Sequence, residues 1–214
     1  MSTYAILGMG RFGRAVAQTL AENGQEVLIV DRSQDLVNQA APFVEQALIA
    51  DLSDEESVKE LGLSSMDAVI VGMAMELETS ILCVMVAKEA GVPMVIAKAR
   101  NRRMGDILLK CGADKIIYPE EETGIRLAKT MLSKDFIDYI GLSEDFGLIQ
   151  MRAKKEWVGK NLKELNLRKK YNINVIAMKN NGETFNYLIN PDQPLETNTV
   201  LYVVADSEGL QKIR

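Results

Sequence analysis

Three glycines near the start of the chain, Gly8, Gly10 and Gly13, have the G-x-G-x-x-G spacing of a phosphate-binding turn. An apolar run precedes them and a helical pattern follows. In such a turn the first glycine permits the sharp bend, the second lets a pyrophosphate approach the backbone, and the third allows close packing of helix on sheet. The free N–H groups of the helix that begins near Arg11 would then face phosphate groups.

A carboxylate, Asp31, follows the second apolar run at the distance from the glycines where it can accept hydrogen bonds from ribose hydroxyls. It would repel a 2′-phosphate, which disfavours NADP. Arg11 places a cation at the unfavourable end of the helix dipole, and a bound anion would remove that conflict. The alternative is a glycine turn that serves only strand–helix packing. The pattern as a whole predicts a nucleotide site.

The composition limits the classes of protein to consider. With 214 residues the chain can form one large or two modest domains. The net charge of −5 argues against a nucleic-acid partner. No apolar run approaches the ~20 residues that cross a bilayer, and no signal peptide is recognised. We therefore expect a cytosolic protein without direct membrane insertion, in which any connection to a membrane must go through a partner.

Several catalytic groups are missing from the sequence. There is no histidine, which removes the commonest general base, the Ser-His pair and most zinc sites. Cys83 and Cys111 lack metal or redox spacing and are expected as buried thiols. No tyrosine is followed four positions on by a lysine. An NAD-dependent dehydrogenase would share the glycine turn and Asp31, but these absences favour a protein that is not an enzyme.

Strand and helix signals alternate through the first ~135 residues, which predicts an α/β domain with a doubly wound parallel sheet. Its ligand crevice should lie beyond the carboxyl ends of the strands. Strands are expected at residues 4–7, 27–30, 44–49, 68–71, 94–97 and 115–117. Helices are expected near residues 11–23, 34–41, 54–61, 76–90, 102–111 and 119–133.

The pattern then changes to a smaller α+β unit, and we place the domain boundary after residue 137. Asn180-Asn181-Gly182 is a strong hairpin-turn signal. Strands are expected at residues 146–151, 175–178, 184–188 and 200–204, with short helices near 162–165 and 207–213.

Four segments together resemble one family: Gly8-Met-Gly-Arg-Phe-Gly13, Ile29-Val-Asp31, Ala50-Asp51, and the Gly-Ala-Asp-Lys-Ile-Ile-Tyr-Pro-Glu stretch of residues 112–120. With the small β-rich tail they resemble RCK (KTN) domain proteins, above all the cytosolic gating subunits of bacterial Ktr and Trk potassium uptake systems. The resemblance implies a nucleotide-binding N-lobe at 1–137 and a regulatory C-lobe at 138–214. It also implies homodimers that form an octameric ring beneath a membrane potassium channel subunit. Exchange of ATP and ADP, or of NADH and NAD, would change the ring and so the gate.

The resemblance also assigns roles to residues. Asp31 would hold the ribose, Asp51 and Leu52 would border the adenine, and Arg11 would reach the terminal phosphates, in its own chain or across the dimer. Glu120 would help to hold Mg²⁺ or Ca²⁺ between the nucleotides. The predicted nucleotide site is completed by Gly8, Gly10, Phe12, Gly13, Arg32, Met73, Ala74, Met75, Lys98 and Arg100.

Each of these roles has a structural alternative. Asp51 can serve as the N-terminal acid of the helix that follows it. Lys98 and Arg100 can complement phosphates at the end of a strand or belong to a solvated run of cations. Glu120 would repel a phosphate unless a divalent cation intervened, and acids favour the first turn of a helix in any case.

Related regulators bind cyclic di-AMP at the dimer interface of the C-lobe. In this chain the corresponding segment predicts a second ligand site, with a plain dimerisation strand and turn as the alternative. Its residues would be Arg168, Asn174, Val175, Ile176 and Pro191. The leading hypothesis is a nucleotide-sensing regulatory subunit. Its alternatives are the dehydrogenase and a stand-alone nucleotide or cyclic-dinucleotide sensor with a soluble partner.

Overall fold

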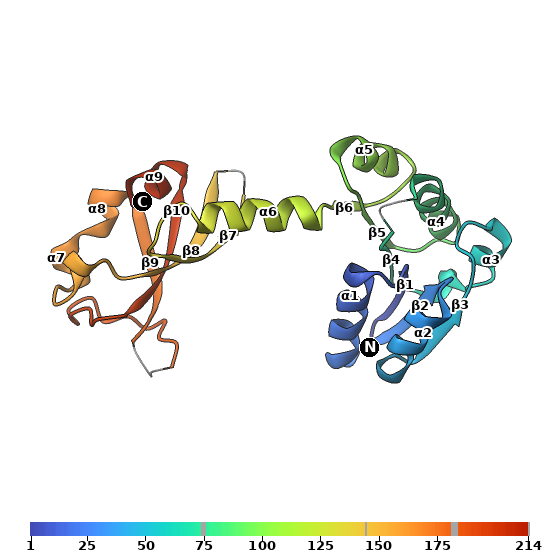
Figure 1. The fold of residues 1–214 in the computed structure, drawn as a ribbon, viewed down its shortest axis with the longest axis horizontal. Helices are drawn as coiled ribbons and strands as arrows, with labels where there is room; N and C mark the ends of the chain where they lie inside the picture. Colours follow the sequence, from blue (N-terminus) through green and yellow to red (C-terminus); the bar gives the residue numbers. More distant parts are fainter. Residues whose placement is uncertain (74–75, 144, 181–183, 214) are drawn as a thin grey trace. The chain divides into compact units, whose positions relative to one another are not determined.

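The computed structural model describes residues 1–73, 76–143, 145–180 and 184–213 (Figure 1). Its contacts divide the chain into two compact units, residues 1–120 and 121–214. The division falls within the helix α6 (Pro119–Thr130), and the domain boundary predicted after residue 137 stays a prediction. In the described part of the chain, no helix combines the length and apolar character needed to cross a membrane.

The first unit is built on a six-stranded parallel sheet with the order β3-β2-β1-β4-β5-β6. The chain runs from β1 outward to β3 and then returns to the other side of β1 with β4, which makes the β1/β4 junction a topological switch point. This confirms the predicted doubly wound fold. The strands are β1 (Thr3–Leu7), β2 (Glu26–Asp31), β3 (Gln46–Ile49), β4 (Ala68–Val71), β5 (Met94–Lys98) and β6 (Lys115–Ile117).

Helices cover both faces of this sheet, which explains why its inner strands are apolar at successive positions. Successive residues of β1 point to opposite faces: Ile6 joins the cluster that includes Ala17, whereas Leu7 joins the cluster that includes Cys83, and all four are fully buried. The helices are α1 (Arg11–Glu22), α2 (Gln34–Ala40), α3 (Glu55–Lys59), α4 (Leu77–Glu89) and α5 (Arg102–Lys110), with short 3₁₀ turns at Ala41–Phe43 and Leu63–Ser65.

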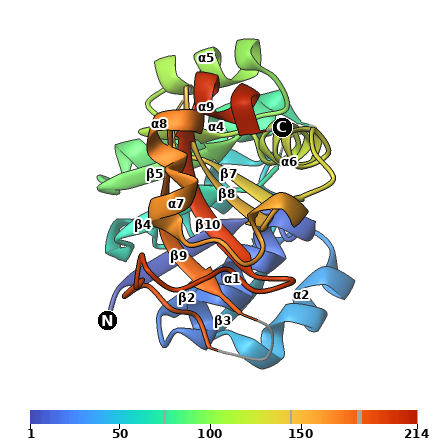
Figure 2. The same ribbon diagram turned by 90° about the vertical axis from the view of Figure 1, so that its left-hand side faces the viewer.

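The second unit is a four-stranded antiparallel sheet with the order β7-β8-β10-β9. Trp157, Ile149 and Leu201 lie in its core, each at most 2% exposed. The strands are β7 (Phe136–Gly141), β8 (Phe146–Arg152), β9 (Ile173–Lys179) and β10 (Val200–Asp206). The remaining elements are the 3₁₀ turn Lys155–Trp157, α7 (Leu162–Leu165), α8 (Leu167–Tyr171) and α9 (Ser207–Ile213), with α7 and α8 toward the viewer in Figure 2.

The strand predicted at residues 184–188 is wrong. The described residues there make one isolated β-bridge, between Asn186 and Met178, and no strand. The Phe185 ring packs edge-on against the Tyr202 ring, while Tyr187 is 69% exposed. The alternation of aromatic and polar residues therefore reflects one anchoring contact and not a sheet face.

Further differences concern the second unit, where strand β7 was not predicted. Residues 181–183 lie outside the described residues, so the hairpin turn predicted at Asn180-Asn181-Gly182 stays a prediction. The short helix α8 was not predicted. It is bracketed by Asn166 and Asn172, both with positive φ, because asparagine tolerates the left-handed region better than most residues.

Candidate functional site

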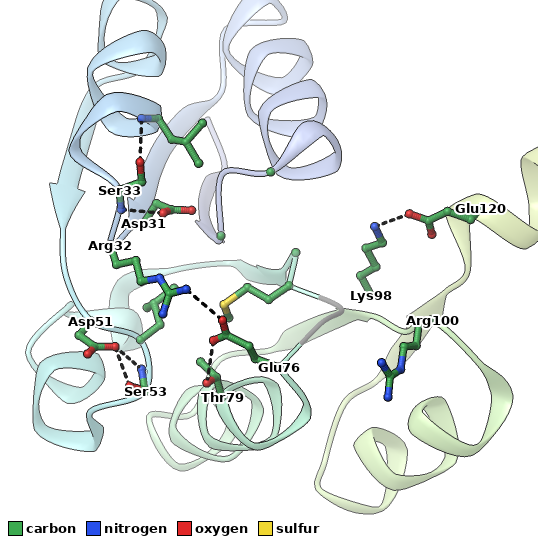
Figure 3. Close-up of a pocket in the computed structure, with 16 residues that line it drawn as sticks. Asp31, Arg32, Ser33, Asp51, Ser53, Glu76, Thr79, Lys98, Arg100 and Glu120 are labelled. Carbon is green, nitrogen blue, oxygen red and sulfur yellow. Dashed lines mark hydrogen bonds and ion pairs between the residues drawn. The ribbon is translucent and has the colours of Figure 1, made fainter.

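A cavity of about 730 Å³ opens at the carboxyl ends of the parallel strands of the first unit (Figure 3). This is where doubly wound sheets bind ligands, and the volume falls in the range of small-molecule sites. Its lining residues are Gly8, Gly10, Asp31, Arg32, Ser33, Leu36, Asp51, Leu52, Ser53, Gly72, Met73, Glu76, Thr79, Lys98, Arg100 and Glu120.

The three glycines of the turn differ in how strictly the protein's own structure requires them. Gly8 has a φ of +96°, which disfavours any side chain. A Cβ on Gly13 would lie 2.0 Å from the carbonyl oxygen of Gly8, so helix α1 can approach β1 only with glycine there. Gly10 has an ordinary φ of −62°, and nothing lies within 4 Å of its missing Cβ. The protein's own backbone does not require glycine at position 10, and the open space beside it suits a ligand.

Asp31 organises the turn as well as facing the cavity. Its Oδ2 accepts a hydrogen bond from the Met9 N–H at 2.7 Å, and its Oδ1 accepts one from the Ser33 N–H at 2.8 Å. Each carboxylate oxygen keeps a second lone pair, which can still accept from a hydroxyl group. Helix α1 has no side-chain hydrogen bond at its N-cap, Gly10. Its first N–H groups therefore remain to be satisfied by water or by an anion.

The loop after β3 forms one wall of the cavity. Asp51 accepts hydrogen bonds from the Ser53 hydroxyl at 2.7 Å and from the Ser53 N–H at 2.9 Å, and both lower the pKa of this carboxyl below its usual value. Leu52 is 5% exposed, and its carbonyl oxygen lies 3.7 Å from the Cys83 Sγ, which donates to it. Burial raises the pKa of Cys83 to about 12, so this thiol remains neutral and acts in packing.

An ion pair joins two walls of the cavity. Arg32 Nη2, at the end of β2, lies 3.2 Å from Glu76 Oε1, at the N-cap of α4. The hydroxyl of Thr79 donates to the other Glu76 oxygen, Oε2, at 3.3 Å. Figure 3 shows this chain of contacts running from Arg32 through Glu76 to Thr79.

A second ion pair lies at the β5 side. Lys98 Nζ is 2.6 Å from Glu120 Oε1, and this hydrogen bond lowers the pKa of Glu120 below its usual value. The Lys98 side chain is only 13% exposed, and its Nζ is 5.9 Å from the centre of the Phe12 ring. Among the described residues no three histidine, cysteine or acidic side chains gather where they could hold a metal ion. Glu120 is thus a single carboxylate, which by itself does not form a metal centre.

The structure brings most of the predicted site residues together. Arg11 and Phe12 do not line the cavity, although Arg11 is exposed at the start of α1; Gly13 is buried against Gly8. Ala74 and Met75 lie outside the described residues. The predicted residues that do line it are Gly8, Gly10, Asp31, Arg32, Asp51, Leu52, Met73, Lys98, Arg100 and Glu120.

Other lining residues were not predicted: Ser33, Leu36, Ser53, Gly72, Glu76 and Thr79. Ser33 and Ser53 each lie two positions after a strand-end aspartate that accepts from their backbone, and this Asp-x-Ser spacing is a signal that sequence reasoning could have used. Glu76 and Thr79 had no such signal.

A smaller cavity, of about 410 Å³, lies in the second unit. Of the residues predicted there, Arg168, Asn174, Val175 and Pro191 line it, whereas Ile176 does not and is 42% exposed. Arg168 Nε donates to Asn174 Oδ1 at 2.7 Å, so the guanidinium is held at the cavity wall.

The fold and the cavity define a class, a Rossmann-like domain of the RCK type joined to a small antiparallel domain. The TrkA-N domain family matches residues 4–119, and the TrkA-C domain family matches residues 149–214. The chain belongs to this family of TrkA-type proteins, which confirms the resemblance read from its motifs.

Relatives extend over nearly the whole chain. The Ktr system potassium uptake protein C of Bacillus subtilis is 38% identical over 180 residues, which are 84% of this chain and 81% of the relative. The Ktr system potassium uptake protein A of Vibrio alginolyticus is 37% identical over 209 residues, 97% and 94% of the two chains. Among solved structures, the GsuK channel bound to NAD has a TM-score of 0.66 at 13% identity, covering 98% of this chain and 38% of that one. This likeness concerns the fold.

Proposed function

We propose that this chain is a nucleotide-sensing regulatory subunit that gates a membrane potassium channel of the Ktr/Trk type and catalyses no reaction itself. The observation that carries the proposal is the cavity beside Gly10, where a glycine leaves space that the protein does not fill. The family supplies the biological setting, since both relatives above are potassium uptake proteins.

The charges of the cavity favour a ligand with one polar, uncharged end and one anionic end. Asp31 and Asp51 lie at the ends of β2 and β3, where hydroxyls and a base can donate to them. Lys98 and Arg100 lie at the end of β5, near the side suited to phosphates. ATP and ADP, or NAD(H), fit this description, and the structural relative above is described as bound to NAD.

A divalent cation is compatible with this arrangement only together with the nucleotide. Mg²⁺ is commonly held by one or two carboxylates plus substrate phosphates, so Glu120 can contribute one ligand to Mg²⁺ or Ca²⁺. The side chain of Glu120 is 72% exposed, and one of its two carboxylate oxygens is paired with Lys98. The cation would neutralise the repulsion between this carboxylate and phosphate oxygens.

Gating requires that the ligand bind two conformations with different affinity. Arg11 is exposed and does not line the cavity of its own chain, which favours a role toward the phosphates of a second copy in a homodimer. Such dimers, assembled into an octameric ring on the cytoplasmic face of a channel, would convert nucleotide exchange into a change of the gate. The chain itself would stay in the cytoplasm, attached through its partner.

The test has two stages. Calorimetry and thermal-shift measurements with ATP, ADP, NADH and NAD⁺, with and without Mg²⁺, should show saturable binding by the full chain and loss of binding in Gly10→Ala. Potassium uptake by cells that depend on a co-expressed Ktr-type channel subunit should then require the wild-type chain. Absence of binding by all four nucleotides would overturn the nucleotide role. Intact binding without any effect on uptake would favour a sensor with a soluble partner.

The cavity of the second unit supports a second ligand, cyclic di-AMP. Arg168 and Asn174 give it one cation and one amide at its wall, and Val175 gives it an apolar contact. Cyclic di-AMP should raise the melting temperature of the wild-type chain and leave that of Arg168→Ala unchanged. An equal rise in melting temperature in both proteins would show that Arg168 does not contribute to binding of cyclic di-AMP.

A further inference from the structure

The residue after Asp31 is an arginine, and its surroundings bear on which nucleotides the site accepts. Dinucleotide-binding folds use an acid at this strand end for a free ribose, whereas an arginine nearby accommodates a 2′-phosphate. This chain has both, Asp31 and Arg32. The charge of the side chain that pairs with Arg32 therefore bears on which of the two ligand types the site accepts.

That side chain is Glu76. Its carboxylate lies 3.2 Å from the Arg32 guanidinium, and the buried Thr79 hydroxyl donates to its second oxygen. Glu76 is also the N-cap residue of α4, so its backbone position is fixed by the helix. The start of α4 therefore fixes the backbone of Glu76, and the hydrogen bond from Thr79 orients its carboxylate toward Arg32.

The charges around Arg32 add up to a negative environment. Three carboxylates line the cavity at or after the ends of β2, β3 and β4, those of Asp31, Asp51 and Glu76, and among the described lining residues of these segments Arg32 is the one cation. The charge of Arg32 contributes to the lowered pKa of Asp51, which places the two groups within electrostatic reach.

We propose that Glu76 restricts the site to nucleotides with an unphosphorylated ribose, because it pairs with Arg32 and adds a negative charge where a 2′-phosphate would lie. This inference rests on the proposed nucleotide-binding function and deepens it by naming the residue that sets specificity. The pair is exposed, with side chains 71% and 46% accessible, so its own contribution to stability is small. Its effect is on ligand choice.

The experiment compares 5′-AMP with adenosine 2′,5′-bisphosphate, which differ only in the 2′-phosphate, by calorimetry on the full chain. Glu76→Gln keeps the size and polarity of the side chain but removes its charge. Arg32 can then form a charge-assisted hydrogen bond with the 2′-phosphate, which should improve the affinity for the bisphosphate relative to 5′-AMP by about tenfold. The double variant Arg32→Gln/Glu76→Gln should lose this gain, because the cation is then gone.

ADP serves as the control ligand. The melting temperature of Glu76→Gln, compared with that of the wild-type chain, shows whether the fold is intact. An unchanged ratio of the two affinities in that variant would overturn the role of Glu76, and a full gain retained in the double variant would overturn the role of Arg32. If the wild-type chain does not bind ADP at all, the proposed nucleotide function fails first and this inference falls with it.

Discussion

The carboxylate of Asp31 accepts a hydrogen bond from the backbone N–H of Met9 at 2.7 Å, which ties the end of β2 to the middle of the glycine turn. Its other oxygen accepts from the Ser33 N–H. Both bonds join groups of the protein itself, so Asp31 holds the shape of the turn in addition to any contact with a ribose. Its loss should affect the phosphate-binding side of the site as well.

Asp31→Asn tests this double role. An amide can accept only through one atom, so one of the two backbone N–H groups loses its partner, and the free energy of unfolding should fall by about 1 kcal/mol. Binding of tripolyphosphate, which has no ribose, should weaken together with binding of ATP. Calorimetry with both ligands distinguishes the two roles. Weaker ATP binding with tripolyphosphate binding unaffected would limit Asp31 to the ribose.

The glycine turn gives a matched pair of substitutions. In Gly13→Ala the new methyl would lie 2.0 Å from the Gly8 carbonyl oxygen, and the free energy of unfolding should fall by more than about 3 kcal/mol. In Gly10→Ala the methyl enters open space, and the cost should stay within about 1 kcal/mol, as expected for alanine at an N-cap.

Nucleotide affinity should follow a different order from stability. Gly10→Ala should remain folded and lose most of its affinity for ADP, because its methyl occupies the space that a pyrophosphate needs. Chemical denaturation and calorimetry on the same preparations measure the two effects. Full ADP affinity in a folded Gly10→Ala protein would show that ligands do not approach this part of the backbone.

Much of the first unit could be predicted because its strands are buried on both faces and read as apolar runs of fixed length. β4 and β6 begin and end where the sequence predicted. The antiparallel unit was harder, since one aromatic contact, Phe185 with Tyr202, imitated the alternation of a strand.

The cavity was predictable where its residues follow strand ends, as Asp31 and Asp51 do, because topology alone brings these positions together. Glu76 was not predicted, since its partner Arg32 is 44 positions away and their approach depends on how α4 begins. Arg11 shows the converse: the motif predicted it, but within one chain it lies outside the cavity lining.

Acid should weaken the first unit through Asp114. Its carboxylate accepts from the Val95 N–H at 2.6 Å and from Lys88 Nζ at 3.1 Å, and these contacts hold its pKa below the usual value. A lowered folded-state pKa stabilises the protein above the unfolded-state value of about 3.9, and the stabilisation is lost as the pH falls through the folded-state pKa.

Asp114→Asn should therefore lower the free energy of unfolding by about 1 kcal/mol at neutral pH, a modest value because the pair is one-third exposed. The difference from wild type should begin to shrink below about pH 4, where the carboxylate of the unfolded chain becomes protonated, and it should be lost as the pH falls through the lowered folded-state pKa. Urea unfolding followed by circular dichroism across this range measures it, with the exposed Asp106→Asn as the control. A difference that stays constant with pH would assign the effect to packing.

Arg11 and Arg14 both lie in the first turn of α1, and both side chains are exposed. They therefore provide a matched pair of substitutions to test phosphate sensing. Arg14 Nη1 donates to Gln39 Oε1 at 2.8 Å, which directs it toward α2, whereas Arg11 stands at the helix end that faces anions.

Arg11→Ala should weaken ATP binding about tenfold more than ADP binding, since the cation meets the additional phosphate, and Arg14→Ala should leave the ratio unchanged. Calorimetry with both nucleotides at one protein concentration measures the ratio. Equal losses for ATP and ADP in Arg11→Ala would mean that the guanidinium contributes general electrostatic attraction, and the discrimination between the two nucleotides would have to come from Lys98 or Arg100.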